Sequence, residues 1–320
     1  MAVFLFPGQG AQSTGMGMDL FELDADRSLG IRDLFTITSD LLHKDVTEIL
    51  TSDGDTLRRT DVSQVAITLV SLSAARLLAS RGITPDACAG FSLGEYPALA
   101  VAGVLSETDA LKVTIERGRV MQAACDRIQA QSSVPPGMAA VLGLPSEQIE
   151  AIIRENGVSG LYPANYNSPL QTVVSGTAEA LDTAERLFKE AGARRCIRLS
   201  VAGPFHSPLM GEAATEFAQF LESIAFSDPS IPLFSNVTGS RLGDRAQAKA
   251  RAVEHISNPV RWTKEEQSIS TWWQSFCAQT GTEHDSVPLS LVEVGPGKVL
   301  CGLWRDSKLP GECKSYTECL

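Results

Sequence analysis

The stretch Gly90-Phe91-Ser92-Leu93-Gly94 constrains the fold more than any other part of this sequence. It places one glycine two positions before a serine and another two positions after it, which is the pattern of a nucleophile elbow. A short, mostly apolar run precedes it, and residues 95–102 have a helical pattern that Gly103 ends. Side chains at the two glycine positions would collide in so sharp a turn. The stretch predicts a strand, a turn and a helix that present Ser92 as a candidate nucleophile; a simple glycine-serine loop is the alternative.

The composition argues against several classes of protein. The net charge is −11, whereas a nucleic-acid-binding protein normally has a basic face. The seven cysteines are scattered without zinc-site spacing, as is typical of reduced cytoplasmic thiols. The N-terminus lacks the pattern of a signal peptide, and no stretch is expected to span a membrane. We therefore expect a cytoplasmic protein that binds no metal, nucleic acid or membrane, in which the sequon Asn236-Val237-Thr238 has no meaning beyond its pattern.

Short apolar runs predict the strands of a parallel sheet, and hence an α/β fold. Residues 2–6 form one such run, and residues 232–237 and 289–294 form two more. The loop over residues 8–17 is rich in glycine, but it contains neither a Walker A motif nor a dinucleotide-binding motif. We expect residues 310–320 to be a mobile tail.

Two long helices follow from the periodicity of the apolar residues. The first covers residues 60–80, with Gln64 expected on its solvated face. The second covers residues 106–125, and Arg117 lies in line with its apolar stripe. A buried guanidinium needs an anionic partner, whereas an arginine at the edge of the stripe would extend to water. The spacing alone does not choose between these two interpretations.

A small subdomain is predicted between residues 128 and 199, where the periodicity changes. The order of its elements is β-α-β-β-α-β, which is the ferredoxin-like unit. The expected strands cover residues 138–144, 161–165, 172–175 and 194–199, and the expected helices cover residues 146–156 and 177–191. Residues 1–127 and 200–309 would then form the large subdomain.

Among the four histidines, His206 is the best placed to act as a base. It lies in a rigid turn bounded by two prolines, between a predicted strand and a helix. His43 and His284 lie in polar segments, and His255 ends a helical run. Because a serine nucleophile needs a base, His206 is the candidate partner of Ser92.

Seven short stretches, spread over about residues 3 to 305, occur in the order known from one protein family. They are residues 6–12, 90–96, 117–122, 164–169, 205–210, 258–262 and 293–297. In these stretches the chain resembles malonyl-CoA:acyl carrier protein transacylases and the acyltransferase domains of polyketide synthases. The resemblance implies a hydrolase-like α/β core with a ferredoxin-like insertion.

The resemblance also implies roles for individual residues. Ser92 would be the nucleophile and His206 the general base, oriented by the backbone carbonyl of His255. The backbone N–H groups of Gln9 and Leu93 would form the oxyanion hole.

The acyl pocket implied by the resemblance contains a carboxylate-binding arginine. Arg117 would bind the free carboxylate of a malonyl group, and Asn165, in one of the matching stretches, would also bind substrate. Phe205 is the residue type associated with malonyl rather than methylmalonyl groups. Phe91 stands where the family usually has histidine, which leaves the preference among extender units open.

The function implied by the resemblance is transfer of a malonyl group from malonyl-CoA to the phosphopantetheine thiol of an acyl carrier protein. The reaction would be ping-pong through a malonyl-serine ester, by a monomer without a permanently bound cofactor, in fatty-acid or polyketide synthesis. An acyl hydrolase that clears carrier proteins, transfer of a different extender unit, and a non-catalytic carrier-binding protein are the alternatives. Arg194, Arg195 and Arg198 would help dock the acidic carrier, unless they are only a solvated strand edge.

Overall fold

The N-terminal apolar run forms a central strand of the main sheet. The computed structural model describes residues 1–131, 133–281 and 287–320. Its main sheet has four parallel strands, which are β1 (Ala2–Phe6), β2 (Ala87–Gly90), β9 (Ser290–Glu293) and β10 (Glu312–Ser315). Their order across the sheet is β10-β9-β1-β2. Phe4 and Phe6 pack on one face of the sheet, and Val3 and Leu5 pack on the other. Because side chains alternate along a strand, this run anchors a helical layer on each face.

The C-terminal segment is an edge strand of this sheet. β10 pairs in parallel with β9, and Tyr316, just beyond it, is 6% exposed and belongs to the hydrophobic core. The prediction of a mobile tail over residues 310–320 is therefore wrong. Hydrogen bonds to a distant strand order this segment, although its own residues have little apolar pattern.

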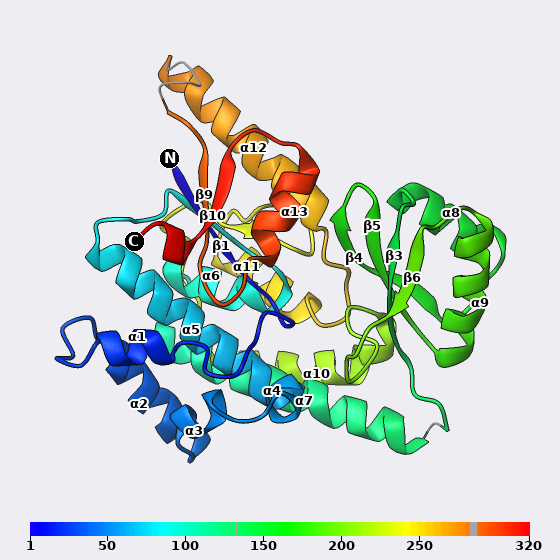
Figure 1. The fold of residues 1–320 in the computed structure, drawn as a ribbon, viewed down its shortest axis with the longest axis horizontal. Helices are drawn as coiled ribbons and strands as arrows, with labels where there is room; N and C mark the ends of the chain where they lie inside the picture. The colour runs from blue at the N-terminus through cyan, green and yellow to red at the C-terminus, as the bar shows by residue number, and fades with distance from the viewer. Residues whose placement is uncertain (132, 282–286) are drawn as a thin grey trace.

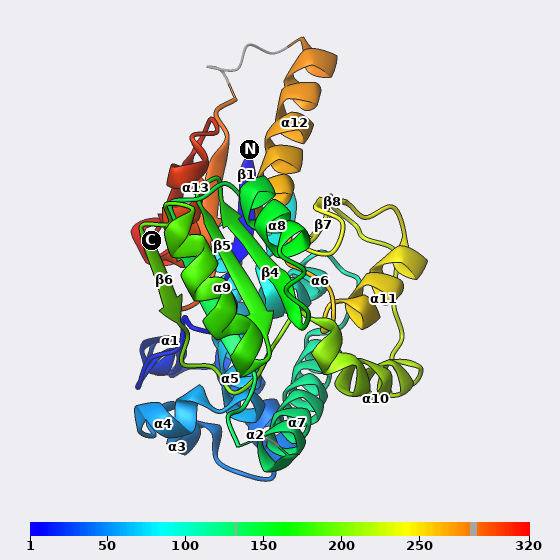
Figure 2. The ribbon, with the colours of Figure 1, turned by 90° about the vertical axis from the view of Figure 1, so that its right-hand side faces the viewer.

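Helices cover both faces of the main sheet (Figures 1 and 2). The helices that share one hydrophobic core with Phe4 and Phe6 are α1 (Met18–Leu23), α2 (Ile31–Leu42), α3 (Val46–Leu50), α4 (Gly54–Arg58), α5 (Thr60–Ser80), α6 (Glu95–Val101), α7 (Glu107–Gln131), α10 (Gly211–Leu221) and α11 (Arg245–Glu254). Of these, α6 contacts strands β1 and β2 directly. The other face is covered by α12 (Trp262–Thr280) and α13 (Val299–Ser307). Such packing on both faces is typical of α/β folds.

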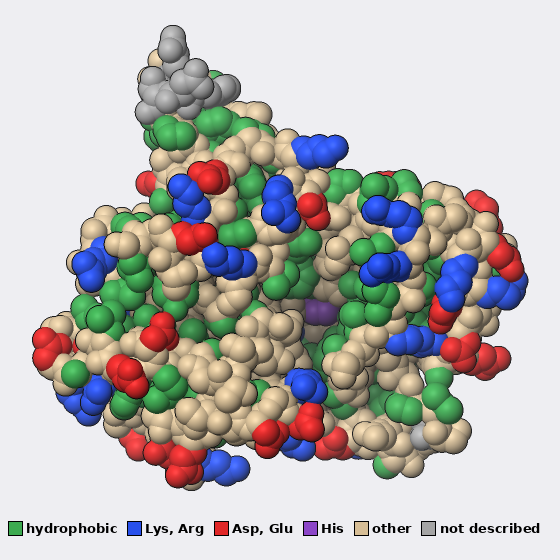
Figure 3. All heavy atoms as spheres, in the orientation of Figure 1, with side chains coloured by type: hydrophobic (Ala, Val, Ile, Leu, Met, Phe, Trp, Pro, Cys, Tyr) green, Lys and Arg blue, Asp and Glu red, His purple; other side chains and the backbone are tan. Residues whose placement is uncertain are grey.

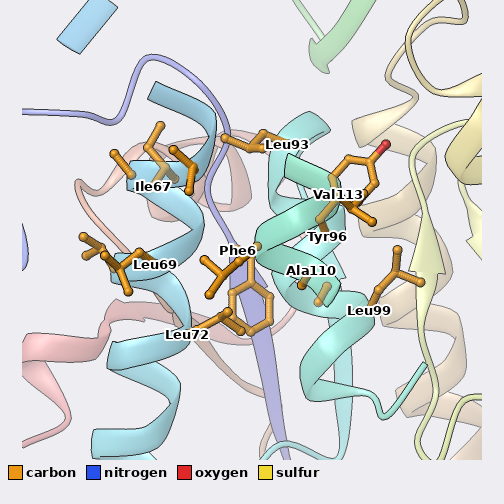
Figure 4. Close-up of a cluster of buried hydrophobic side chains, with 14 of the residues drawn as sticks. Phe6, Ile67, Leu69, Leu72, Leu93, Tyr96, Leu99, Ala110 and Val113 are labelled. Atoms are coloured by element: carbon orange, nitrogen blue, oxygen red, sulfur yellow. The ribbon is translucent and has the colours of Figure 1, made fainter. Parts of the chain in front are cut away.

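Helix α5 is buried almost all round in this fold. Figure 4 shows Ile67, Leu69 and Leu72 of α5 in the cluster that also contains Phe6 of β1. Gln64 is fully buried as well, so its expected place on a solvated face is wrong. Contrary to the expectation from the sequence, α5 is long and apolar enough to cross a membrane, but 83% of its apolar stretch is buried within the protein, as in the core helix of a globular protein.

The segment after α10 extends the main sheet only briefly. Leu233 forms a parallel bridge with Cys88 of β2. The chain then forms the two-residue strand β7 (Phe234–Ser235), which pairs with β8 (Ser240–Arg241). The strand predicted over residues 232–237 is thus shorter than expected.

The small subdomain has the ferredoxin-like order of elements. Its strands are β3 (Gly137–Leu142), β4 (Leu161–Ser168), β5 (Gln171–Gly176) and β6 (Arg195–Arg198), and its helices are α8 (Ser146–Glu155) and α9 (Ala178–Glu190). The antiparallel sheet has the strand order β4-β5-β3-β6. The expected boundary between residues 127 and 128 falls inside α7, which continues to Gln131.

The two subdomains are joined by backbone hydrogen bonds as well as by the chain itself. Val260 donates its N–H to the carbonyl of Ala164 at 2.8 Å and accepts from the N–H of Tyr166 at 2.9 Å. Figure 3 shows a hollow between the subdomains, with a histidine side chain at its floor and Lys and Arg side chains on both sides.

Candidate active site

The turn after β2 has the geometry of a nucleophile elbow. Strand β2 leads into a short 3-10 helix over Ser92–Gly94 and then into α6. A Cβ atom at Gly90 would overlap the carbonyl oxygen of Gly94, and one at Gly94 would overlap that of Phe6. Ser92 itself has the left-handed φ of +50° that such a turn requires. The steric prediction made from the two glycines is confirmed.

His206 lies against this serine, although the two residues are far apart in the chain. The Nε2 atom of His206 is 2.8 Å from Ser92 Oγ. On the other side of the ring, Nδ1 lies 3.0 Å from the carbonyl oxygen of His255 and 3.2 Å from that of Asn258. Since only a protonated Nδ1 can donate to these carbonyls, Nε2 is left free to accept the serine proton.

The surroundings of His206 keep its imidazole neutral. Burial, and then the positive charge of Arg117, lower the pKa of His206 to about 4, while the carbonyl partners oppose this shift. The Ser92–His206 pair is thus in the protonation state that base-assisted attack requires at neutral pH.

Arg117 of α7 is buried in the same site. Its side chain is 1% exposed, and its Nη1 donates to Oε1 of Gln64 at 2.7 Å. Its Nε and Nη2 have no hydrogen-bond partner among the described residues. Burial lowers the pKa of Arg117, but a guanidinium remains charged at physiological pH. Of the two interpretations left open by the spacing, the structure therefore selects the buried cation.

A cavity of about 260 Å³ connects these groups. Most of the residues predicted for the site line it: Gln9, Phe91, Ser92, Arg117, Asn165, Phe205 and His206. Apolar walls come from both subdomains, through Met121, Met138, Val173, Leu199, Val201, Val299 and Leu303. A mostly apolar cavity with a few convergent polar groups suits a small acyl group with one charged end.

The aromatic residues of the cavity differ in their surroundings. Phe91 is half-buried and its ring stands edge-on to Trp262, with 5.4 Å between the ring centroids. Phe205 is buried beside His206, and its carbonyl accepts a hydrogen bond from Ser175 Oγ at 2.5 Å.

Two predicted residues, Leu93 and His255, do not line the cavity, and the roles predicted for them belong to their backbone. Leu93 is not among the cavity-lining residues; its side chain is buried in the hydrophobic cluster shown in Figure 4. Its N–H lies in the first turn of a helical segment, where backbone donors have no helical partner. His255 is buried with its ring edge-on to His206 at 5.7 Å. His284, which the sequence did not favour as a base, lies outside the described residues.

The structure places the predicted docking arginines next to the cavity but not in it. Arg194, Arg195 and Arg198 are exposed on or beside edge strand β6, and Arg198 pairs with Asp182 at 2.5 Å. The chain that leaves β6 then lines the cavity with residues 199–201.

Several polar residues of the site were missed by the sequence reasoning. Gln64 holds Arg117, and Asn167 lines the cavity with a buried Oδ1 that has no partner among the described residues. Asn167 could have been found from Asn165, because residues two apart on a strand share a face. Glu95 is 2% exposed, and burial raises its pKa to about 7.

The chemistry of this arrangement is that of a serine-dependent acyltransferase. It provides an elbow serine, a neutral histidine base and a buried cation in one cavity. The described residues contain no group of three or more His, Cys, Asp or Glu side chains that could hold a metal ion.

Comparisons with known proteins agree with this class. The acyl transferase domain family matches residues 3–276. The malonyl CoA-acyl carrier protein transacylase of Bacillus subtilis (strain 168) is 36% identical over 306 residues, which cover 94% of this chain and 88% of the relative. The chain belongs to the malonyl-CoA:acyl carrier protein transacylase family of acyltransferases.

Solved structures of related proteins have the same fold. A crystal structure of the enzyme MCAT from Streptococcus pneumoniae is similar with a TM-score of 0.83 and 33% identity, covering 98% of this chain and 95% of that one. A malonyl-transacylase solved in complex with its type II polyketide synthase acyl-carrier protein is similar with a TM-score of 0.83 and 32% identity, over 98% and 95% of the two chains.

Proposed function

We propose that the protein transfers a malonyl group from malonyl-CoA to the phosphopantetheine thiol of an acyl carrier protein. The observation that carries this proposal is the burial of Arg117 in the cavity of Ser92 and His206. No carboxylate of the described residues forms an ion pair with Arg117. The ring of Tyr96 and the nearby buried Glu95 stabilise its charge in part, but its Nε and Nη2 are left without hydrogen bonds, which is unfavourable for a buried charge. The free carboxylate of a malonyl group supplies the missing partner and brings the thioester carbonyl to the serine.

The first half-reaction forms a malonyl-serine ester. Ser92 Oγ attacks the thioester carbonyl while its proton passes to Nε2 of His206, which lies 2.8 Å away. The carbonyl oxygen becomes an oxyanion, which the backbone N–H groups of Gln9 and Leu93 stabilise. When the oxyanion collapses, the carbon–sulfur bond breaks, and coenzyme A leaves with the proton from His206.

The second half-reaction reverses these steps with a different thiol. The carrier's phosphopantetheine thiol gives its proton to Nε2 of His206 and attacks the ester carbonyl of the malonyl-Ser92. The carbon–oxygen bond then breaks, and His206 returns the proton to Ser92 Oγ. The carbonyls of His255 and Asn258 hold the Nδ1 side of the ring throughout, so the same imidazole orientation serves both halves.

Two residues of the cavity, Arg117 and Phe205, would select the acyl group by its charge and by its size. Arg117 binds the malonyl carboxylate, and an acyl group without this charge would leave the guanidinium unpaired. Phe205 restricts the space beside His206, and Phe91 and Asn165 complete the walls. A malonyl group carries the charge that Arg117 requires and is small enough for the space beside Phe205.

The remaining features of the proposal concern partners and setting. We propose that the protein acts as a monomer. We further propose that the reaction needs no metal or bound cofactor and takes place in the cytoplasm, in fatty-acid or polyketide synthesis.

The proposal is tested by the intact mass of the protein after mixing with a panel of acyl-CoAs. We expect a malonyl-sized adduct on the wild type and none on Ser92→Ala. Adding the phosphopantetheinylated carrier should move the adduct to the carrier. Release of free malonate without a modified carrier would favour the hydrolase instead, and absence of any adduct would contradict both enzymes.

A further inference from the structure

Asn236 joins the elbow to the rest of the fold, and nothing in the reaction described above uses it. It follows strand β7, lies 144 residues beyond Ser92 in the chain, and is fully buried. It does not line the cavity. We propose that Asn236 is a positioning residue that holds Ser92 in its left-handed conformation and so fixes the direction of its hydroxyl.

The side chain of Asn236 spans both ends of the elbow turn. Its Oδ1 accepts a hydrogen bond from the N–H of Ser92 at 2.6 Å. Its Nδ2 donates to the carbonyl oxygen of Gly90 and also to Oε2 of Glu265 at 3.0 Å. One planar amide therefore bonds to the backbone on each side of Phe91.

The backbone of Asn236 is held just as firmly. Its N–H donates to Oε2 of Glu95 at 2.8 Å, and its carbonyl accepts from the N–H of Arg261 at 2.9 Å. Glu95 begins α6, the helix that follows the elbow, and Arg261 precedes α12. The amide thus has a fixed position and can act as a template for the turn.

The elbow needs such a template because its conformation is strained. A non-glycine residue with positive φ persists only where the surrounding structure imposes it. At Ser92 the glycines remove the steric obstacles, but they do not select the turn, since glycine is also free to adopt other conformations. The two hydrogen bonds of Asn236 select it.

The residue type suits this role closely. An amide offers one acceptor and two donor hydrogens in a fixed plane, as Ser92 N–H, Gly90 C=O and Glu265 together require. Aspartate keeps the acceptor but loses both donors, and alanine leaves Ser92 N–H and Gly90 C=O buried and unpaired. Nδ2 of Asn236, the atom to which a glycan would be attached at this sequon, is buried and engaged in both hydrogen bonds in the folded protein.

The consequence concerns the chemical step and not substrate binding. A rotation of the Ser92 backbone would move Oγ away from Nε2 of His206, and a displacement of about 1 Å can cost about 10²-fold in rate. Arg117 and the cavity walls would be unchanged. This inference rests on the proposed role of Ser92 as nucleophile, but not on the identity of the acyl group.

The test measures loading of the enzyme by malonyl-CoA in Asn236→Asp and Asn236→Ala, together with labelling of Ser92 by a fluorophosphonate. We expect kcat for loading to fall by about 10²-fold, with KM for malonyl-CoA changed less than about threefold. Labelling by the fluorophosphonate should fall in parallel, because it reports the serine without needing a malonyl group. Thr38→Val is the matched control: Thr38 is fully buried on α2 and donates one hydrogen bond to the carbonyl of Leu34 at 2.7 Å, far from the cavity.

A merely structural Asn236 would behave like Thr38, with a lower Tm and an unchanged kcat per folded molecule, and that result would overturn the proposal. If neither variant folds, hydrogen exchange of the wild type decides: slow exchange of the Ser92 amide supports the proposal, and exchange as fast as in an exposed loop contradicts it. A wild type that reacts with the fluorophosphonate but not with malonyl-CoA would refute the proposed function while leaving the role of Asn236 open to the same comparison.

Discussion

Ser92 and His206 both have left-handed backbone conformations, with φ of +50° and +57°, and their Oγ and Nε2 atoms lie 2.8 Å apart. The strain therefore lies on both sides of one hydrogen bond. Such strain is often found where a protein fixes reacting groups before the substrate arrives. Here the two turns come from different parts of the chain, and each aims its side chain at the other.

The first prediction concerns the pH dependence of kcat/KM for malonyl-CoA, which reports the free enzyme. His206 must be neutral to accept the serine proton, and its pKa is lowered to about 4. We expect kcat/KM to be constant through neutral pH and to fall as the pH drops through about 4. Rapid-mixing kinetics over this pH range would measure it. An acid limb near the ordinary histidine value of about 6.5 would contradict the effect of burial.

The variant Arg117→Ala tests whether the charge of Arg117 contributes to the lowered pKa of His206. The charge of Arg117 helps to lower the pKa of His206. The acid limb of Arg117→Ala, measured with acetyl-CoA, should therefore move to higher pH.

The lowered pKa of His206 also affects stability. Between about pH 6.5 and 4 the unfolded chain binds a proton at His206 that the folded chain does not bind. The free energy of unfolding therefore decreases as the pH falls through this range.

The second prediction concerns the choice between malonyl and acetyl groups. Arg117→Ala removes a buried cation that would make charge-assisted hydrogen bonds of about 1.5–3 kcal/mol each. We expect kcat/KM for malonyl-CoA to fall by about 100-fold or more, and that for acetyl-CoA to rise. Arg119→Ala is the control, because Arg119 lies on the same helix but is exposed and paired with Glu116. Equal losses for both acyl groups would refute the carboxylate role.

The third prediction concerns the size of the acyl group. Phe205 is buried in the cavity next to His206. Replacing it with alanine would open space beside the reacting carbonyl, so we expect the ratio of kcat/KM for methylmalonyl-CoA over malonyl-CoA to rise by about tenfold, as one or two methyl-sized contacts would give. Phe276→Ala, on the exposed part of α12, should leave the ratio unchanged. An unchanged ratio in Phe205→Ala would remove this residue from the selectivity.

The local parts of the site could be predicted from the sequence because local sterics determine them. Only glycine fits at positions 90 and 94, so the elbow follows from five residues. The strand over residues 2–6 follows equally from its composition. The bond between Ser92 and His206 has no such local signal, and it was inferred from the need of a serine for a base and from the resemblance.

What the sequence could not provide depends on contacts between distant segments. The period of α5 indicated one apolar face, but the packing of other helices covers its opposite face and buries Gln64 against Arg117. Asn236 likewise attracted notice only as part of a sequon without meaning beyond its pattern, since nothing near it in the sequence reveals the elbow. Strand β10 exists because β9 offers an edge with which it can pair.

The fourth prediction follows from that last contact. Deleting residues 310–320 removes β10 and the buried Tyr316. Burial of such a side chain contributes about 1.5–3 kcal/mol, and each strand hydrogen bond about 0.5–1.5 kcal/mol. We expect urea unfolding to show a loss of at least about 3 kcal/mol, with part of this loss in Tyr316→Ala. An unchanged midpoint would mean that the segment behaves as the mobile tail first expected.

The fifth prediction concerns the carrier protein. β6 is an edge strand with exposed arginines, and the chain that follows it lines the cavity. An acidic carrier that docked there would have its phosphopantetheine arm close to Ser92. We expect Arg195→Glu to raise KM for the carrier by about tenfold at low salt, and by less at high salt, where screening weakens the attraction.

The same variant should load from malonyl-CoA at the wild-type rate, because Arg195 does not line the cavity. Arg154→Glu makes the same change of charge on α8 of the same subdomain, which packs against β4 and β5, and should leave KM for the carrier near its wild-type value. If both variants raise KM equally, the effect comes from net charge and not from a docking site. If neither does, these arginines are a solvated strand edge, and the carrier approaches Ser92 over another part of the rim.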